Sequence, residues 1–233
     1  MGFFYLIGTC SKSENFLSSK NILRVNDAQV TEKKCLLQMS ISNNTKTEKE
    51  KGNQEMNGYK KIKQQLVHKG NIIDVYQDVI QLPNGKEVTW DFVKHKGAAA
   101  VVAIDEDGKI IMVHQYRNSV DRMSLEIPAG GINDGENSKE AAIRELEEET
   151  GYVAGNIELL VDAVTAIGFS NETIAIYVAT DLTKTQQHLD EDEFVEIRTY
   201  DVEELVTMIL DGKIKDAKTI AGVFAYRAKF LQK

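Results

Sequence analysis

A glycine-rich stretch followed by a glutamate-rich segment is the feature that most constrains this chain. Residues 126–152 read Glu-Ile-Pro-Ala-Gly-Gly-Ile-Asn-Asp-Gly-Glu-Asn-Ser-Lys-Glu-Ala-Ala-Ile-Arg-Glu-Leu-Glu-Glu-Glu-Thr-Gly-Tyr. We predict a helix over residues 137–150, because Asn137 and Glu140 have the spacing of a capping box. Gly151 suits the left-handed position that ends a helix.

Three carboxylates project from one face of that helix, since Glu145, Glu148 and Glu149 are spaced i, i+3 and i+4. Like charges at this spacing destabilise a bare helix, and Arg144 offsets only part of the repulsion, chiefly toward Glu148. Clustered carboxylates are the ligands that Mg²⁺ prefers, and the preceding glycines let the backbone approach such a site closely. The alternative is a solvated acidic helix with ordinary caps.

The charge balance narrows the classes of partner. The 233 residues carry 28 basic and 36 acidic side chains, for a formal net charge of −8. We therefore expect no nucleic-acid partner, because phosphate backbones are bound by basic surfaces. No stretch of about 18 apolar residues occurs, so we expect no membrane-spanning helix and no membrane partner.

The two cysteines, Cys10 and Cys35, are too few for a disulfide framework. They favour a reducing compartment, and we predict a cytoplasmic protein. Both lie in residues 1–57, which we predict to be a disordered leader or a segment outside the fold, because residues 40–57 are too polar to build a core. The folded domain is predicted to span residues 58–233.

The rest of the chain alternates strands and helices around one core, which indicates an α/β fold. Two strands joined by an Asn-Gly turn form a predicted antiparallel hairpin over residues 72–82 and 86–95. The further predicted strands are residues 98–104, 109–116, 157–165, 173–180 and 194–200. The predicted closing helices are residues 202–210 and 217–231.

The glutamate-rich segment resembles the signature of the Nudix hydrolases. Gly130 is followed by five residues, Glu136, seven residues, and then Arg-Glu-Leu-x-Glu-Glu-x-Gly-Tyr over residues 144–152. The resemblance spans residues 60–231. It implies a Nudix α/β/α sandwich with a mixed sheet, preceded by the N-terminal antiparallel β-hairpin.

Within that family the chain looks most like the ADP-ribose pyrophosphatases. The segments that carry this likeness are residues 113–117, 125–130, 168–172 and 190–196. The resemblance implies metal-dependent hydrolysis of the diphosphate bond of ADP-ribose, or of related nucleoside diphosphate sugars, to AMP and ribose 5-phosphate. One position departs from the subgroup, because Ile167 stands where a proline is usual.

The same resemblance implies roles for the residues of the signature. Mg²⁺ or Mn²⁺ would be bound by Glu145, Glu148, Glu149 and the carbonyl of Ala129. Glu136 would support this site by orienting Arg144 or a water at the metal. Arg144 would position the glutamates, and we group it with Glu148 and Glu193 as the catalytic residues.

Three further roles follow from similar enzymes, each with a plainer alternative. Glu193, or its neighbour Glu191, would take the proton of the attacking water, unless residues 190–193 are only a solvated acidic loop. Arg117 would bind substrate phosphate, or else form a surface ion pair. Trp90 would stack on the adenine, or else belong to the core.

The hairpin of similar enzymes mediates a homodimer and helps to build the adenine pocket, so we expect a homodimer here. Two other functions stay open. The first is a Nudix pyrophosphatase for another nucleoside diphosphate sugar, NADH or a dinucleoside polyphosphate. The second is a nucleotide-sensing Nudix module without catalysis, against which the complete set of glutamates argues.

Overall fold

The computed structural model describes residues 57–189 and 193–231. The expected leader therefore lies outside the described residues, apart from Asn57, and so does Glu191. The boundary at residue 58 stays a prediction. In the described part of the chain, no helix has both the length and the apolar character needed to cross a membrane.

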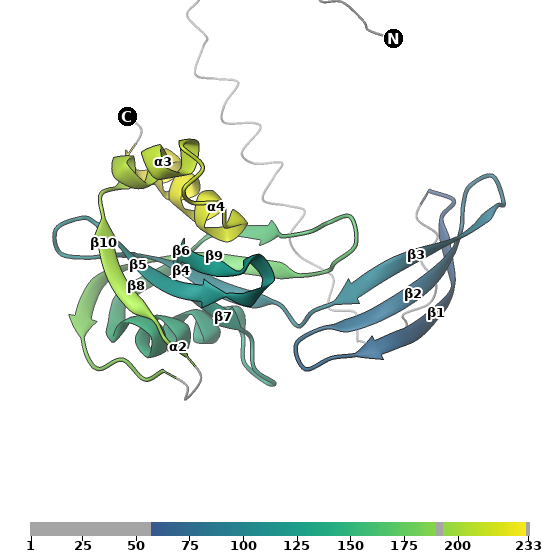
Figure 1. Cartoon of the computed structure of the whole chain (residues 1–233), viewed down its shortest axis with the longest axis horizontal. Coiled ribbons are helices and arrows are strands. Elements are labelled where there is room, and N and C mark those ends of the chain that lie inside the picture. The colour runs from purple at the N-terminus through teal and green to yellow at the C-terminus, as the bar shows by residue number, and fades with distance from the viewer. Residues whose placement is uncertain (1–56, 190–192, 232–233) are drawn as a thin grey trace, which may run out of the picture. The chain divides into compact units, whose positions relative to one another are not determined.

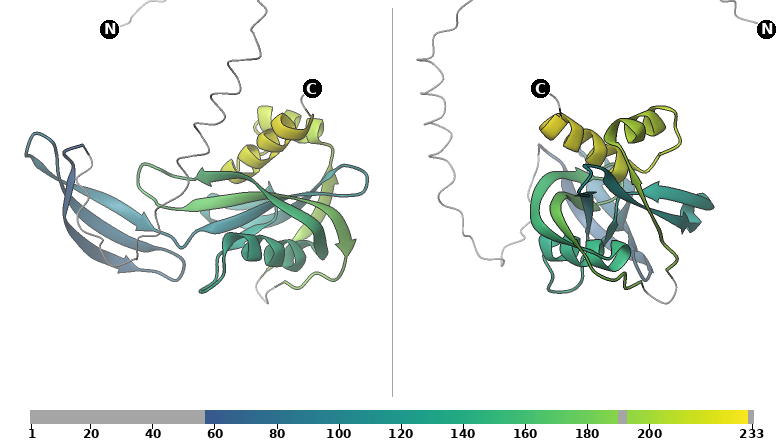
Figure 2. Two further views of the ribbon diagram at one scale, coloured as in Figure 1. Left: turned by 180° about the vertical axis from the view of Figure 1, so that it is seen from behind. Right: turned by 90° about the vertical axis from the view of Figure 1, so that its left-hand side faces the viewer.

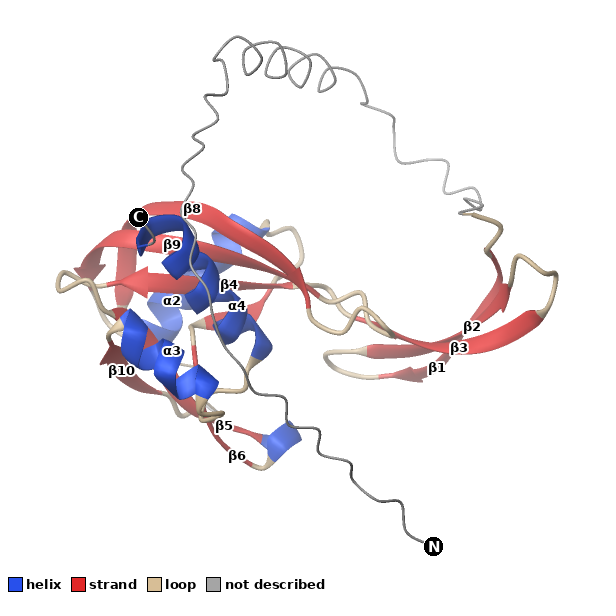
Figure 3. Cartoon of the chain, turned by 90° about the horizontal axis from the view of Figure 1, so that it is seen from above, coloured by secondary structure: helices blue, strands red, loops and turns tan. Residues whose placement is uncertain are grey.

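The first sheet has three antiparallel strands in the order β1-β2-β3 (Figure 3). They are β1 (Lys60–Lys69), β2 (Asp74–Gln81) and β3 (Glu87–Lys94). The β2–β3 pair is the predicted hairpin, with Asp78 opposite Trp90. Strand β1 was not predicted, because every one of its residues is exposed and its sequence lacks a clear apolar alternation.

The second sheet is mixed, as predicted. Its order is β10-β5-β4-β9-β8, with β6 paired to β5 and β7 paired to β4. Strands β4 and β9 run parallel, while the other pairs are antiparallel. The strands are β4 (Ala98–Ile104), β5 (Ile110–Arg117), β6 (Arg122–Glu126), β7 (Ala129–Gly131), β8 (Tyr152–Val164), β9 (Thr173–Lys184) and β10 (Glu196–Tyr200).

Helices cover both faces of this sheet, which gives the predicted α/β/α sandwich (Figures 1 and 2). Helix α2 (Ser138–Thr150) lies on one face, and α3 (Val202–Leu210) and α4 (Ala217–Tyr226) lie on the other. A short 3₁₀ helix, η1 (Asn118–Val120), follows β5, and a π-helical turn, η2 (Arg227–Leu231), continues α4.

Strand β4 shows why both faces need cover. All seven of its residues are buried. Ala98, Ala100 and Val102 belong to the core cluster on the side of α3 and α4. Ala99, Val101 and Ala103 belong to the cluster on the side of α2. Successive side chains of a strand point to opposite faces, so a continuous apolar run is stable only between two layers of helix.

Candidate active site

Helix α2 presents the glutamates because its caps and its buried stripe fix its position. The side chain of Asn137 accepts hydrogen bonds from the backbone N–H groups of Lys139 and Glu140, and Glu140 closes the predicted capping box. Gly151 ends the helix at φ 68°, as predicted. Ala142 and Leu146 are fully buried on the face that packs on the sheet.

Glu149 carries the most perturbed carboxylate of this helix. The residue is only 3% exposed, and its Oε2 accepts a hydrogen bond from the Ala129 N–H at 2.9 Å. Burial raises the pKa of Glu149 to about 8, and the nearby charges of Glu145 and Glu193 act in the same direction. The Ala129 N–H opposes this rise without reversing it.

Arg144 ties the remaining acids of the signature together. Its Nη1 donates to Oε1 of Glu145 at 2.7 Å and to Oε2 of Glu148 at 2.8 Å. Its Nε donates to Oε1 of Glu136 at 2.9 Å, which holds the pKa of Glu136 below its usual value. A fourth contact, from Nη2 to the carbonyl of Gly131 at 2.9 Å, anchors the guanidinium to β7.

Gly130 packs so closely on α2 that any side chain at this position would displace the carboxylate of Glu145. A Cβ atom built on Gly130 would lie 2.0–2.4 Å from the carboxylate atoms of Glu145. At Gly131, next along the chain, a Cβ would meet no atom within 4 Å. The missing side chain at residue 130 therefore makes room for one particular carboxylate.

Glu193 lies close to the acids of α2. Its charge raises the pKa of both Glu145 and Glu149, although burial is the largest cause at each of these residues. We call Glu145, Glu148, Glu149 and Glu193 the glutamate cluster. Glu191, the alternative to Glu193 as the base, lies outside the described residues.

The glutamate cluster fits a hard divalent cation by its chemistry. Its donors are carboxylate oxygens, and a bound cation would offset the burial and neighbouring negative charge that raise the pKa of Glu149. Within residues 57–189 and 193–231, however, no three His, Cys, Asp or Glu side chains are arranged as they stand to hold a metal ion. Arg144 occupies one oxygen of Glu145 and one of Glu148. A bound cation would have to compete with its guanidinium.

A cavity of about 830 Å³ opens beside Ala129 and Gly130. At one end it is lined by Arg117, Asp216 and Lys218. The guanidinium of Arg117 is not free, because Nε and Nη2 donate to the two carboxylate oxygens of Glu126 at 2.9 and 2.8 Å. Lys218 also donates to Glu126, at 2.5 Å.

Glu126 is the carboxylate that both cations share. The residue is only 2% exposed, and burial alone would raise its pKa. The hydrogen bonds and charges of Arg117 and Lys218 prevail, and they lower the pKa of Glu126 to about 2. We call Arg117, Glu126, Asp216 and Lys218 the cation clamp.

The loop after β8 lines another part of the cavity, together with residues of β3 and of the turn between β1 and β2. Phe169, Ile73 and Val93 are among its lining residues. The loop is fixed to β3, because the Val93 N–H donates to the carbonyl of Phe169 at 2.7 Å. Ile167, which replaces the subgroup proline, is 86% exposed on this loop.

Trp90 does not line this cavity within the same chain. It is 51% exposed on β3, its ring centroid lies 6.4 Å from that of Tyr59, and it does not line the cavity. The alternative of a core residue is therefore wrong for Trp90.

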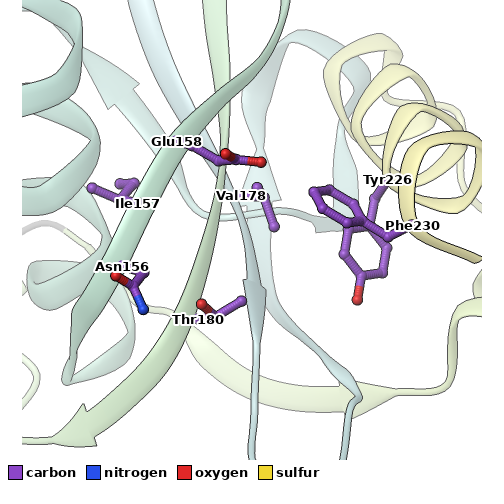
Figure 4. Close-up of a pocket in the computed structure, with 7 residues that line it drawn as sticks. All are labelled: Asn156, Ile157, Glu158, Val178, Thr180, Tyr226 and Phe230. Carbon is purple, nitrogen blue, oxygen red and sulfur yellow. The ribbon is translucent and has the colours of Figure 1, made fainter.

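A second cavity, of about 460 Å³, lies between β8, β9 and the end of the chain's last described helix (Figure 4). The rings of Tyr226 and Phe230 face Asn156 and Thr180 across it. None of its lining residues lines the first cavity, and none was predicted as a site residue.

Sequence reasoning missed Glu126, Asp216 and Lys218 as residues of the site. None of them belongs to a local pattern of charges like the one on α2. Lys218 offered the one available signal, because it is a single charged residue in the otherwise uncharged helix α4. A lysine in such a helix is usually paired if it is buried.

Comparisons with known proteins agree with this geometry. A family model described as "NUDIX domain" matches residues 94–223. The chain is 39% identical to an ADP-ribose pyrophosphatase of Bacillus subtilis over 175 residues, which cover 74% of this chain and 92% of that protein. It is 40% identical to a methanol dehydrogenase activator of Bacillus methanolicus, over 70% of this chain and 90% of that protein.

Among solved structures, one described as an ADP compounds hydrolase shares the fold. The TM-score is 0.65 with 22% identity, over 72% of this chain and 91% of the other.

Proposed function

Because the chain belongs to the NUDIX domain family and is a Nudix hydrolase, we propose that it hydrolyses the diphosphate bond of ADP-ribose, or of a related nucleoside diphosphate sugar, to AMP and ribose 5-phosphate. The observation that carries the proposal is a cavity that two cationic side chains line together with Ala129 and Gly130, the residues that lie against Glu149 and Glu145. A diphosphate ester needs negative oxygens for a metal at one place and positive groups for its own oxygens at another.

We propose Mg²⁺ or Mn²⁺ as the cofactor, held by Glu145, Glu148, Glu149 and the carbonyl of Ala129. Such an ion neutralises phosphate charge and makes water more acidic. The residues suit this role because the pKa of Glu149 is raised by burial and by the negative charge around it.

Arg144 and Glu136 act together in this proposal. Glu136 fixes the guanidinium through Nε, and the guanidinium in turn sets the orientation of the Glu145 and Glu148 carboxylates. Arg144 therefore positions the metal ligands from the side of α2 that faces β7.

We propose Glu193 as the base that removes the proton of the attacking water. Its support is its position, close enough to influence Glu145 and Glu149. Replacing it by glutamine keeps the shape and removes the basic oxygen, so we expect kcat to fall by about 100-fold or more. Unchanged activity in Glu193→Gln would transfer the role, with Glu191→Gln as the next variant to assay.

We propose that a homodimer completes the adenine site. The three-stranded sheet exposes Leu66, Val67 and Trp90, which would be covered by a second copy. Trp90 would then stack on the adenine bound by the partner, and ADP-ribose should quench its fluorescence. Light scattering on the purified protein tests the dimer itself, and a monomer at micromolar concentration would contradict it. The cytoplasmic location stays a prediction.

The decisive experiment is a substrate panel with product identification. We expect the chain in Mg²⁺ to release AMP and ribose 5-phosphate from ADP-ribose, to lose activity in EDTA, and to recover it when Mg²⁺ is restored. ADP-glucose, NADH and a dinucleoside polyphosphate complete the panel. Binding of ADP-ribose without cleavage in Mg²⁺ would favour the sensing module instead.

A second candidate is a dinucleotide such as NADH as the main substrate. The specific observation in its favour is the 40% identity to a methanol dehydrogenase activator. A dehydrogenase cofactor carries the same diphosphate bond, so the same cluster and clamp would serve. A higher kcat/KM for NADH than for ADP-ribose in the panel would select this candidate.

A further inference from the structure

We propose that Lys218 is a substrate-binding residue: with Arg117 it forms a two-cation site for the phosphate that the metal does not hold, and buried Glu126 positions both cations. This inference rests on the proposed function, because it assigns a second phosphate of that substrate to the part of the cavity that Arg117 and Lys218 line. It gives the clamp a role in binding rather than in stability alone.

The geometry of Glu126 is the first support. Its Oε2 accepts from Lys218 Nζ at 2.5 Å and from Arg117 Nη2 at 2.8 Å, while Oε1 accepts from Arg117 Nε at 2.9 Å. One buried carboxylate therefore holds the two cationic groups next to each other. A fixed pair of cations loses little side-chain freedom when an anion arrives.

The donors left over are the second support. A guanidinium has five N–H donors and an ammonium has three. In the described structure Arg117 donates two hydrogen bonds to Glu126, and Lys218 donates one to Glu126 and one to Asp216 at 3.1 Å. Both side chains line the cavity beside Ala129 and Gly130, so their remaining N–H donors lie where substrate can reach them.

The third support is the N-terminus of α4, because its hydrogen bonds fix the position of Lys218 relative to the segment that contacts the glutamate cluster. Asp216 caps this helix by accepting from the Thr219 N–H at 2.9 Å. The hydroxyl of Thr219 in turn accepts from the Ile127 N–H at 2.9 Å. The segment of residues 126–130 thus runs from Glu126 of the clamp to Ala129 and Gly130. These two residues lie against Glu149 and Glu145.

This arrangement predicts a preference for substrates with two adjacent phosphates. A metal at the glutamate cluster neutralises one phosphate, and Arg117 and Lys218 donate to the next. A phosphomonoester cannot occupy both places. The clamp is thereby a specificity device for diphosphate esters, and its contribution should appear in KM more than in kcat.

The test compares Lys218→Met with Lys218→Arg in the full chain at saturating Mg²⁺. We expect Lys218→Met to raise the KM for ADP-ribose by roughly tenfold or more while kcat changes less than about threefold, since a charge-assisted hydrogen bond is lost. Lys218→Arg keeps the charge and should recover most of the loss. The matched control is Lys229→Met, which breaks an ion pair with Glu158 on the side of the second cavity and should leave KM unchanged.

Calorimetric binding keeps the inference separate from turnover and from folding. Titration with α,β-methylene ADP-ribose in Mg²⁺ should show the same tenfold weakening in Lys218→Met, and urea unfolding checks that the variant is folded. Unchanged KM and unchanged affinity in the folded variant would overturn the inference and leave the proposed function standing. If the wild type does not cleave ADP-ribose, the proposed function fails, and Mg²⁺-pyrophosphate replaces the analogue as the probe. Equal pyrophosphate affinity of wild type and Lys218→Met then overturns the inference as well.

Discussion

Two buried carboxylates of this molecule have pKa values shifted in opposite directions: Glu126 in the cation clamp and Glu149 in the glutamate cluster. The residues are 2% and 3% exposed, so burial acts on both alike. Yet the pKa of Glu126 falls to about 2, whereas the pKa of Glu149 rises to about 8. Two cationic side chains donate to Glu126, while Glu149 receives a backbone N–H and faces other acids.

The difference shows what each region contributes. The protein itself neutralises the clamp, so removal of one of its members leaves a buried charge without a partner. In the glutamate cluster, burial and neighbouring negative charge raise the pKa of Glu149, so a bound cation would stabilise its ionised form. Loss of the carboxylate of the clamp is thus expected to lower stability, whereas loss of a carboxylate of the glutamate cluster is expected to lower activity, and three variants test that division.

The largest effect is expected at the glutamate cluster. Glu149→Gln keeps the shape of the side chain and removes its charge, so we expect hydrolysis in Mg²⁺ to fall by about 100-fold or more. The free energy of unfolding without metal should not decrease, because the folded protein no longer has to hold a carboxyl group whose pKa burial raises to about 8. Steady-state kinetics and urea unfolding measure the two quantities.

Glu147→Gln is the control for that variant, because residue 147 lies on the same helix outside the cluster. Near-normal hydrolysis in Glu149→Gln, or in the companion Glu148→Ala, would contradict the assignment of a metal to the glutamate cluster.

A second variant tests whether position, rather than charge, matters within the cluster. Gly130→Ala would bring a Cβ to 2.0–2.4 Å from the Glu145 carboxylate atoms, and this flexible side chain must move away. We expect activity to fall by about 100-fold, since displacements near 1 Å cost that much, with the melting temperature little changed. Gly131→Ala, where the Cβ meets nothing, should retain activity. Equal activities of the two variants would show that the contact is unimportant.

The third variant tests the clamp through the pH dependence of stability. The pKa of Glu126 is lowered from 4.5 to about 2 in the folded protein, which corresponds to about 3 kcal/mol of stability above pH 5. Because the folded pKa is the lower one, this contribution is present above the unfolded pKa and is lost as pH falls toward 2. We expect Glu126→Gln to be about 3 kcal/mol less stable than wild type at pH 7, and less than half of that at pH 3.

Urea unfolding at pH 3, 5 and 7 measures this gap. Glu158→Gln, which loses an exposed ion pair with Lys229, should show almost no gap at any of these pH values. A gap for Glu126→Gln that stays constant with pH would mean that the clamp does not depend on the charge of this carboxylate.

The sequence predicted the parts of the fold whose cause is local. Strand β4 and helix α3 have the predicted bounds. The strand is a continuous apolar run and the helix is an amphipathic segment, and both patterns are visible in consecutive residues. The caps of α2 were also predicted, because Asn137, Glu140 and Gly151 act on their own neighbourhood. Strand β7 was missed, because Ala-Gly-Gly has no strand pattern and is extended only through its pairing with β4.

The site divides along the same line. The acids of α2 were found because one helix spaces them, and their contacts with Arg144 span at most eight residues. The clamp was missed because Glu126 and Lys218 are 92 residues apart in the chain. No local pattern joins two such charges, so only the folded sheet and α4 bring them together.

The parallel pairing of β4 with β9 has a consequence for how the chain is made. Ala98 pairs with Ile174, so the centre of the mixed sheet cannot close until the ribosome has released a strand encoded far downstream. Until then an uncharged, wholly apolar strand lacks its partner on one side, although β5 and β7 can already pair with its other side. Nascent chains that stop before β9 should therefore be the ones that chaperones retain, and this enzyme should emerge as a late folder during its own synthesis.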